Sequence, residues 1–522
     1  MNRSLNEYSR PGGSASARSF SRQGDRSSAA TVRPVRALVV AAAAAVCAGL
    51  AATNAGGRPE TVTSAAAPRI QLLGLKPVGQ LQTAVFYGWL ASTATLGQAF
   101  ARVQAAGASA VRVTATWSSI APRGSRKPST FHAANPADPL YRWETLDTAI
   151  RVAIGHQLQP IVVLLDAPAW AEGVAGGPPG TRRPDPRELA QFATAAARRY
   201  SGTFEGLPRV RYWQVWNEPN LYIFLSPQVE AGRLVSPEIY RAMLNAVAPA
   251  IHAVHSDNVV IAGGTAPFGQ HGWYRATPPL KFTRELLCMR GRVRPAAKCG
   301  ARTRFDVWAH HPYTGGDPSH HAAGPDDVSL PELPQVQRLL RASWAAHHIV
   351  APRRPPLWVT EFSWDTKPPD PKAVPERLQA RWVSEALYRM WSVGVSVVTW
   401  FQLQDDPMSK SSFQSGLYFV SGRAKPALRA FRFPFVALPA SKGVSIWGRT
   451  WTSKRASVVV QQTLGGRWKR VARLTANRYG IFRARLRVPS RGRLRALAAG
   501  DSSLPFAVKA PPDYPLHSPF GS

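Results

Sequence analysis

Short apolar runs alternate with longer stretches of helical period through most of this chain, and no other feature constrains its fold more. The runs are rich in Val, Ile, Trp and Tyr, as buried parallel strands are. The eight runs predicted as strands cover residues 83–89, 110–117, 160–166, 210–218, 259–264, 305–313, 357–362 and 395–402. The stretches predicted as helices cover residues 95–106, 143–156, 186–200, 237–255, 280–289, 333–348 and 375–393.

Eight strand–helix units predict an α/β fold, a (β/α)8 TIM barrel over residues 69–438. The alternative is an open, doubly wound sheet. No glycine-rich phosphate loop follows the first predicted strand, so the pattern favours the barrel. Long loops at 118–142, 265–304 and 403–425 explain why this barrel is larger than usual.

The C-terminal segment has a different period. Residues 482–488 alternate strictly between apolar and basic side chains, as a half-buried strand does. Residues 457–461 and 468–474 are two further predicted strands, and Gly465 and Gly466 between them form a hairpin turn. These features predict a small all-β sandwich domain over residues 441–510, followed by a tail at 511–522.

The first 68 residues have the character of an export signal followed by a linker. A polar, basic segment precedes a run at 37–52 that is mostly Ala, Val and Leu, with small residues after it. An uncleaved membrane anchor is the alternative, although the run is short for a bilayer span. We therefore expect a secreted or cell-envelope-associated protein.

Cysteine usage fits that location. Cys47 lies in the apolar run and would leave with a cleaved signal. Cys288 and Cys299 remain, in the basic segment CMRGRVRPAAKC, and an exported protein favours a disulfide bond between them. The alternative is two free thiols.

The charge is strongly and unevenly positive. The chain has 65 Lys and Arg against 30 Asp and Glu, a formal charge of +35, and residues 441–500 contain no acidic residue. Such a segment predicts association with an anionic cell-envelope polymer or acidic polysaccharide. No zinc-finger, helix-turn-helix or RNP-type pattern accompanies the charge, so we expect no specific nucleic-acid partner. A merely solvated basic face is the alternative.

Two strand ends carry a glutamate each. Glu218 lies in VWNEPN at the end of the fourth predicted strand, and Glu361 lies in WVTEFSW at the end of the seventh. Barrel enzymes keep their active sites at the C-terminal ends of the strands, where these two strands lie across the mouth from each other. Glycoside hydrolysis needs such a pair of carboxyl groups on either side of one glycosidic bond.

The combination of WNEPN and VTEF resembles glycoside hydrolase clan A, in particular families 39 and 5, the beta-xylosidase-like and cellulase-like groups. The resemblance covers the barrel only. The C-terminal pattern GGRWKRVARL…GIFRARL resembles the immunoglobulin-like modules of exported bacterial proteins. In the barrel, the resemblance implies Glu218 as general acid/base and Glu361 as nucleophile in a retaining mechanism, without metal or cofactor.

Five further residues match the family pattern as substrate-binding or supporting positions. Asn217 matches the residue that binds the sugar 2-hydroxyl, and Arg112 matches an arginine that keeps the nucleophile ionised. The family's His-x-Tyr matches His311 and Tyr313, and the aromatic floor beneath the sugar matches Trp400.

Each of these roles has a structural alternative. Arg112 could form only a structural ion pair, and Trp400 could be a core residue. His310 and His311 are adjacent, so strand alternation sends only one of them inward, and the motif favours His311. The chain lacks an obvious third ligand beside this pair, which makes metal binding there unfavourable.

The sequence therefore predicts an exported, retaining glycoside hydrolase that cleaves O-glycosidic bonds in a β-linked polysaccharide or oligosaccharide. The alternative is a non-catalytic carbohydrate- or cell-wall-binding protein on a barrel scaffold. Binding without turnover would distinguish the second from the first.

Overall fold

The computed structural model describes residues 82–86, 93–174, 176–269, 276–291, 293–296, 299–409, 413–452, 454–512 and 514. The predicted signal, with Cys47, and residues 515–522 of the predicted tail lie outside this part. Within the described residues, no helix combines the length and the apolar character that crossing a lipid bilayer requires.

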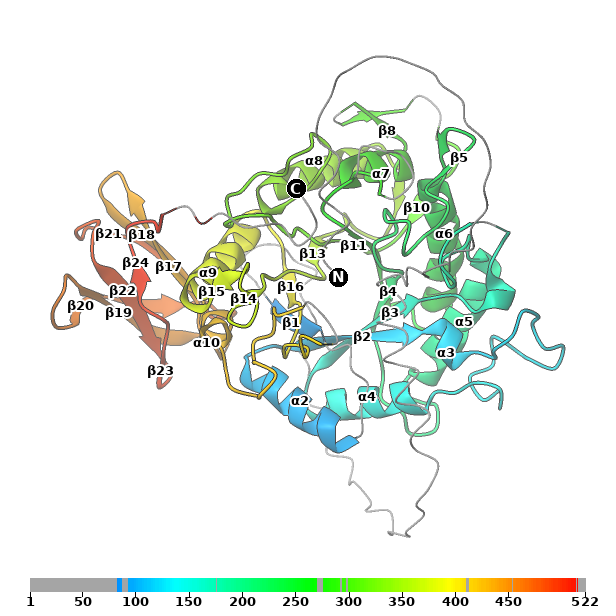
Figure 1. Cartoon of the computed structure of the whole chain (residues 1–522), viewed down its shortest axis with the longest axis horizontal. Helices are drawn as coiled ribbons and strands as arrows, with labels where there is room; N and C mark the ends of the chain where they lie inside the picture. The colour runs from blue at the N-terminus through cyan, green and yellow to red at the C-terminus, as the bar shows by residue number, and fades with distance from the viewer. Residues whose placement is uncertain are drawn as a thin grey trace, which may run out of the picture.

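Eight parallel strands close into a barrel, in the order β1-β16-β13-β11-β7-β4-β3-β2 (Figure 1). The predicted barrel is thus found, and the open doubly wound sheet is not. The barrel strands are β1 (Gln82–Phe86), β2 (Ala110–Thr116), β3 (Gln159–Leu165), β4 (Tyr212–Val215), β7 (Val259–Thr265), β11 (Val307–His310), β13 (Leu357–Val359) and β16 (Val397–Trp400).

Helices surround the barrel and bury one face each against it (Figure 1). The start of α5 shows why such a helix forms: Asp185 accepts hydrogen bonds from the backbone N–H groups of Arg187 and Glu188, and Pro186 occupies the first turn. The helices are α2 (Thr93–Ala105), α3 (Trp117–Ile120), α4 (Glu144–Gly155), α5 (Pro186–Arg199), α6 (Ser236–Val254), α7 (Pro279–Leu286), α8 (Leu333–Ala345), α9 (Glu376–Ser392) and α10 (Pro426–Arg432), with 3-10 turns η1 (Ala169–Ala171) and η2 (Leu330–Glu332).

The inside of the barrel is a packed apolar core. Strand alternation directs one set of side chains inward and the other toward the helices. The inward cluster contains Ala110, Ile161, Tyr212, Val259, Ile261, Val307, Ala309, Trp358 and Val397, contributed by seven of the eight strands. This layer forms a floor beneath the strand ends, where the polar residues begin.

The connecting loops contain short strand pairs. Because each of these strands has only two residues, the pairs shape the loops without extending the barrel. They are β5 (Val229–Glu230) with β6 (Arg233–Leu234), β8 (Met289–Arg290) with β9 (Arg294–Pro295), β10 (Thr303–Arg304) with β12 (Ile349–Val350), and β14 (Thr366–Lys367) with β15 (Val374–Pro375).

The C-terminal strands form two antiparallel sheets beside the barrel (Figure 1). One sheet has the order β17-β18-β21, and the other has the order β20-β19-β22-β23 with β24 paired to β22. Their bounds are β17 (Phe435–Ala440), β18 (Gly443–Arg449), β19 (Ala456–Thr463), β20 (Lys469–Ala476), β21 (Ile481–Leu486), β22 (Arg493–Ala498), β23 (Asp501–Ser502) and β24 (Phe506–Ala507). The strand β17 begins at Phe435, before residue 438, where the barrel was predicted to end.

These sheets pack directly on the last barrel helices. Trp447 of β18 contacts the rings of Tyr388 and Trp391 of α9, at centroid distances of 5.6 and 5.5 Å. The guanidinium of Arg381 lies 3.9 Å from the centroid of the Phe506 ring. The aromatic contacts join the two parts into one continuous apolar cluster.

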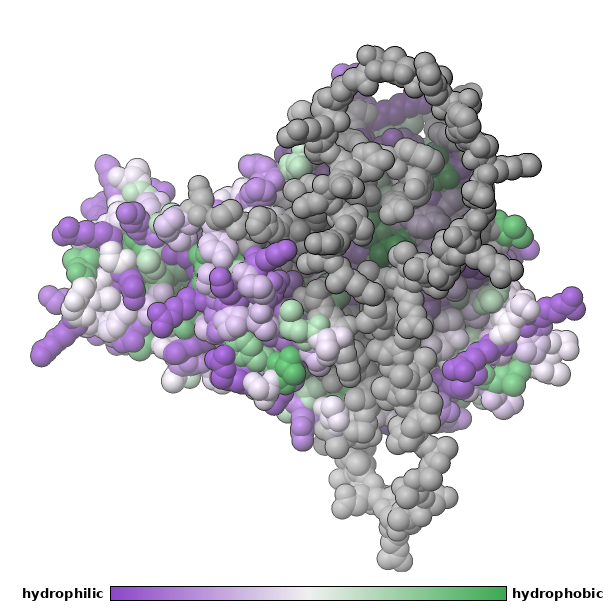
Figure 2. Space-filling model, in the orientation of Figure 1, coloured by the Kyte–Doolittle hydropathy of each residue, from purple (hydrophilic) through white to green (hydrophobic). Residues whose placement is uncertain are grey.

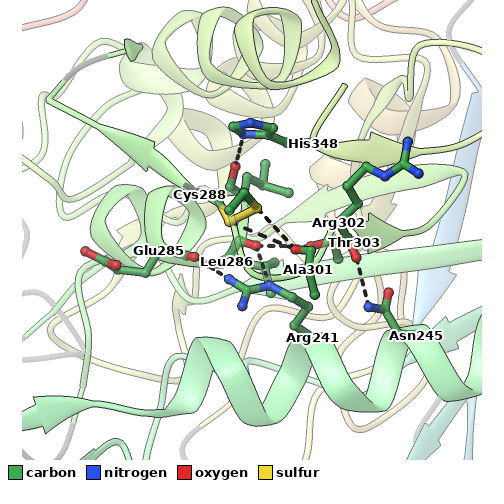
Figure 3. Close-up of a disulfide and its surroundings, with 11 residues drawn as sticks. Arg241, Asn245, Glu285, Leu286, Cys288, Ala301, Arg302, Thr303 and His348 are labelled. Atoms are coloured by element: carbon green, nitrogen blue, oxygen red, sulfur yellow. Dashed lines mark hydrogen bonds between the residues drawn. A yellow bond between two sulfur atoms is a disulfide. The ribbon is translucent and has the colours of Figure 1, made fainter. Parts of the chain in front are cut away.

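The predicted disulfide bond between Cys288 and Cys299 is present, with their Cα atoms 5.4 Å apart (Figure 3). It closes the β8–β9 hairpin that follows α7. Arg241 of α6 holds the adjacent end of α7, because its Nε–H donates to the carbonyl oxygen of Leu286 at 2.9 Å (Figure 3). The disulfide bond therefore closes the base of an arginine-containing hairpin, directly after the helix end that Arg241 holds.

Candidate active site

Glu218 stands on a tight turn that follows β4. The strand ends at Val215, three residues before its predicted end, because the backbone turns into the left-handed region at Trp216 (φ 69°) and again at Glu218 (φ 40°). The backbone N–H of Glu218 donates to the carbonyl oxygen of Gly264 in β7 at 3.0 Å. This bond to the neighbouring strand fixes the glutamate at the C-terminal end of the barrel.

Glu361 follows β13 and lies close to Glu218. One carboxylate oxygen from each glutamate and one ring nitrogen of His311 lie within 4.8 Å of one another. Both carboxyl groups are largely buried, with 14% of the Glu218 side chain and 12% of the Glu361 side chain exposed. The fold thus brings together two carboxyl groups that are remote in sequence.

Arg112 connects the residues around Glu361. Its Nη1–H donates to Glu361 Oε1 at 2.6 Å, and its Nη2–H donates to Asn217 Oδ1 at 2.8 Å. Its Nε–H donates to Gln214 Oε1 at 3.1 Å. Because Arg112 is only 2% exposed, this charge-assisted network is shielded from water.

The two adjacent histidines at the end of β11 and just after it point in opposite directions. His311 Nδ1 lies 2.9 Å from Glu218 Oε1, and its Nε2 lies 3.0 Å from Thr360 Oγ1. His310 instead contacts Thr265 Oγ1 and the carbonyl oxygen of Val328, both at 2.8 Å. Burial lowers the pKa of His310 to about 3, so this ring is neutral and structural.

Tyr313 supplies a second contact to Glu361. Its hydroxyl donates to Glu361 Oε2 at 3.2 Å, on the carboxylate oxygen that Arg112 does not hold. Burial, together with the negative charge of Glu361, raises the pKa of Tyr313 well above its ordinary value. The phenol therefore remains a proton donor over the whole physiological range.

The structure places Trp400 away from the two glutamates. Its Nε1–H donates to the carbonyl oxygen of Ser415, and its ring contacts Phe431 of α10, outside the barrel. Val397 belongs to the inward cluster, so alternation along β16 sends Trp400 outward and Phe401 inward. Phe401 is also the more exposed of the two. Of these two adjacent residues, alternation turns Phe401, and not Trp400, toward the barrel interior, which corrects the sequence-based choice.

Three positions that support the site were not among the sequence candidates. Gln214 and Thr360 are fully buried polar residues that orient Arg112 and His311. Gly264 has φ of 60°, and a Cβ atom there would lie 2.6 Å from Gln214 Nε2 and 3.3 Å from His311 Nε2. The available sequence signal for Gln214 was its position in β4, two residues after Tyr212, whose side chain points into the barrel.

Three of these groups could also bind a metal ion. Glu218, His311 and Glu361 offer three donor atoms within 4.8 Å of one another. His310, the other member of the adjacent pair, bonds to Thr265 and Val328 instead. However, the Arg112 guanidinium already lies 2.6 Å from Glu361 and would repel a cation. The donor set therefore fits a metal ion poorly.

The two glutamates experience different environments. Burial raises the pKa of Glu218, and the negative charge of Glu361 acts in the same direction, although the contact with His311 opposes them. Glu361 faces a guanidinium and a phenol hydroxyl. A carboxyl group with a raised pKa thus lies beside one that contacts a guanidinium, an arrangement suited to general acid and nucleophilic chemistry.

Comparison with known proteins gives similarity in structure alone. No family model matches the sequence, and no curated protein matches it. A family 39 glycoside hydrolase from the gut symbiont Bacteroides cellulosilyticus WH2 is 14% identical, with a TM-score of 0.49 over 79% of this chain and 82% of that one. The GH39 enzyme from Xanthomonas axonopodis pv. citri is 17% identical, with a TM-score of 0.44 over 81% and 92%. A glucosidase from Croceicoccus marinus is 12% identical, with a TM-score of 0.46 over 79% and 95%.

Proposed function

We propose that this protein is a retaining glycoside hydrolase of clan A that cleaves β-linked carbohydrate. The observation that carries the proposal is the close approach of Glu218 and Glu361 at the C-terminal end of the barrel, within 4.8 Å. Retaining enzymes hold their carboxyl groups about 5–5.5 Å apart, whereas inverting enzymes need about 6.5–9.5 Å to admit a water molecule. The spacing therefore supports retention.

In the first step, a carboxylate oxygen of Glu361 attacks the anomeric carbon. A covalent bond forms between them as the bond to the leaving oxygen breaks, and Glu218 transfers its proton to that oxygen. In the second step, the Glu218 carboxylate takes a proton from water, and the hydroxide attacks the same carbon and releases Glu361. One water molecule is consumed, and both glutamates return to their starting states.

The surrounding residues prepare these steps. Arg112 donates to Glu361 Oε1 and orients it, while Tyr313 orients its Oε2. Arg112 also occupies the amide oxygen of Asn217, which leaves the amide nitrogen to donate to a sugar hydroxyl. His311 fixes the acid/base Glu218.

Phe401 takes over the role of aromatic floor that the sequence assigned to Trp400. Aromatic rings suit this place because the C–H face of a sugar is apolar, whereas its hydroxyls need polar partners. Alternation from the inward Val397 places Phe401, the residue after β16, on the inner side and supports this assignment.

We place the protein outside the cytoplasm, either secreted or on the cell envelope. The disulfide bond between Cys288 and Cys299 is compatible with this location, because such bonds persist mainly in oxidising compartments. The export signal in the first 68 residues remains a prediction.

A panel of aryl β-glycosides and β-linked polysaccharides tests the proposed activity. The native protein should hydrolyse at least one of them with retention at the anomeric carbon, and Glu361→Gln should be inactive on the same substrate. Glu285→Gln is a matched control, because the side chain of Glu285 is exposed on α7 and lies outside the site. An inactive native protein across the panel, or an active Glu361→Gln variant, would contradict the proposal.

A further inference from the structure

The second feature that calls for a function is the outer face of the sheet formed by β20, β19 and β22. Its inner face is apolar: Val458 and Val460 of β19 and Leu494 and Ala496 of β22 are buried in the common core. Side chains alternate along each strand, so the residues between them point outward. The outer face therefore belongs to a rigid, well-packed sheet.

Arginines occupy this outer face in register. Arg470 of β20 and Arg495 of β22 both pair with Gln461 of β19, so they lie on either side of it in one row across three strands. Arg473 pairs with Val459 one step along the strands, and Arg493 pairs with Thr463 one step in the other direction. We call Arg470, Arg473, Arg493 and Arg495, together with Trp468, the basic face.

Trp468 is already engaged with the arginines. The guanidinium of Arg495 lies 4.3 Å from the centroid of its ring, and the Nε–H of Arg495 donates to Gln461 Oε1 at 2.9 Å. The two contacts hold the guanidinium between Trp468 and Gln461. The basic face is thus partly preorganised for a ligand.

The basic face belongs to a segment of the chain without acidic residues. Residues 441–500 contain fifteen Lys and Arg and no Asp or Glu. Among the described residues, the arginines of the basic face form no ion pair, whereas Arg429 and Arg432 at the edge of the barrel approach Asp501. Figure 2 shows hydrophilic residues gathered over these C-terminal strands, at the left of the view.

We propose that the basic face binds an acidic polysaccharide along its row of arginines. Neighbouring strands lie about 4.8 Å apart, so the row places cations about 10 Å apart on a surface that an extended polyanion can follow. Single-stranded nucleic acids bind sheets through several aromatic side chains that stack successive bases. This face has one tryptophan, and Arg495 covers one side of its ring, so the observations favour carbohydrate.

This inference does not rest on the proposed hydrolysis. Polygalacturonate is a suitable probe, because it is acidic and its linkages are α, so the proposed β-glycosidase activity would leave it intact. Binding of the full-length protein is measured between about 0.05 and 0.5 M salt, where the Debye length falls from about 14 to about 4 Å. Neutral dextran, duplex DNA and vesicles with anionic lipid serve as comparison ligands.

Two triple variants separate the face from the overall charge. The first is Arg470→Gln/Arg473→Gln/Arg493→Gln. The control, Arg338→Gln/Arg353→Gln/Arg354→Gln, removes the same charge from exposed positions of the barrel.

We expect the native protein and the control to bind polygalacturonate equally well and in a salt-dependent manner. The face variant should bind at least tenfold more weakly at about 0.1 M salt, and its slope of log affinity against log salt should fall by up to about three, or about one for each cation removed. Equal losses in both triple variants, binding that salt does not weaken, or tighter binding of DNA or vesicles than of polygalacturonate would each overturn the inference.

Discussion

Replacement of Arg112 by methionine is the most informative single perturbation of the barrel. The change removes the cation 2.6 Å from Glu361 and leaves that carboxylate largely buried without its partner. Loss of one partner of a buried ion pair costs about 3–5 kcal/mol of folding free energy. For a folded part of roughly 430 residues, with an unfolding entropy of about 0.9 kcal/mol/K, this corresponds to a fall in the thermal midpoint of about 3–6 °C.

Activity should change in a way that stability alone does not explain. Without the guanidinium, Glu361 Oε1 and Asn217 Oδ1 lose the donor that orients both of them, so kcat should fall about a hundredfold. Arg112→Lys keeps the charge but not the planar guanidinium that contacts Glu361, Asn217 and Gln214. It should therefore retain more activity than Arg112→Met but less than the native protein.

Arg199→Met is the matched control. Arg199 forms a comparable partly buried pair with Asp147 at 2.6 Å, between α5 and α4 and away from the glutamates. Differential scanning calorimetry and kcat are measured for both variants. We expect both to lower the thermal midpoint, but only Arg112→Met to lower kcat about a hundredfold. A kcat of Arg112→Met equal to that of Arg199→Met would refute the role assigned to the arginine.

Three further predictions concern other parts of the barrel. Because burial raises the pKa of Glu218, its proton should persist above the ordinary glutamate range, and Glu218→Ala should abolish the alkaline limb of kcat/KM on an activated aryl glycoside. Azide should then restore turnover and give a β-glycosyl azide, and its failure to do so would count against the acid/base role. Burial raises the pKa of Asp365 from 3.8 to about 7, so native stability should fall as pH rises between these values, by up to about 4 kcal/mol. Asp365→Asn, which can still accept from the Gln414 N–H, should remove that fall, so urea denaturation should show equal stabilities at pH 4 and a more stable variant at pH 8. Phe401→Ala should raise KM, whereas Trp400→Phe should lower the thermal midpoint with KM nearly unchanged, and the reverse pattern would return the aromatic floor to Trp400.

The apolar runs were enough to predict the barrel, because the strands from β2 onward are largely buried on both faces and rich in β-branched or aromatic residues. The strand starts agree within two residues, but the predictions for β4, β11, β13 and β16 extend two or three residues beyond the observed strand ends. The strand β4 stops at Val215 instead of residue 218, and β13 stops at Val359 instead of residue 362. The residues beyond these points leave the ladder to present side chains at the mouth, and a left-handed turn such as that at Trp216 has no signature in composition.

The same limit explains why Trp400 was chosen instead of Phe401 and why Gln214 was not predicted. Trp400 and Phe401 are adjacent aromatic residues, and a strand that is apolar on both faces does not reveal which of the two points inward. Only the packing of Val397 inside the barrel settles the alternation. Gln214 acquires its importance from Arg112, which is 102 positions away in the chain, so its role depends on a contact that the fold creates.

The C-terminal strands were only partly predicted. The alternating basic and apolar residues of β21 were recognisable, whereas β17 (Phe435–Ala440) was counted as the end of the barrel. It follows α10 directly and contains Pro439, which is unusual in a strand. Its pairing with β18 supplies the hydrogen bonds that the local sequence does not indicate.

Covalent trapping tests the central claim most directly. A 2-deoxy-2-fluoro β-glycoside with an activated leaving group, made from whichever sugar the protein hydrolyses, should inactivate the enzyme by forming a slowly hydrolysed ester. Mass spectrometry of the digested protein should then find one fluoroglycosyl group on the peptide that contains Glu361. A label on Glu218, or hydrolysis with inverted anomeric configuration and no covalent adduct, would contradict the account.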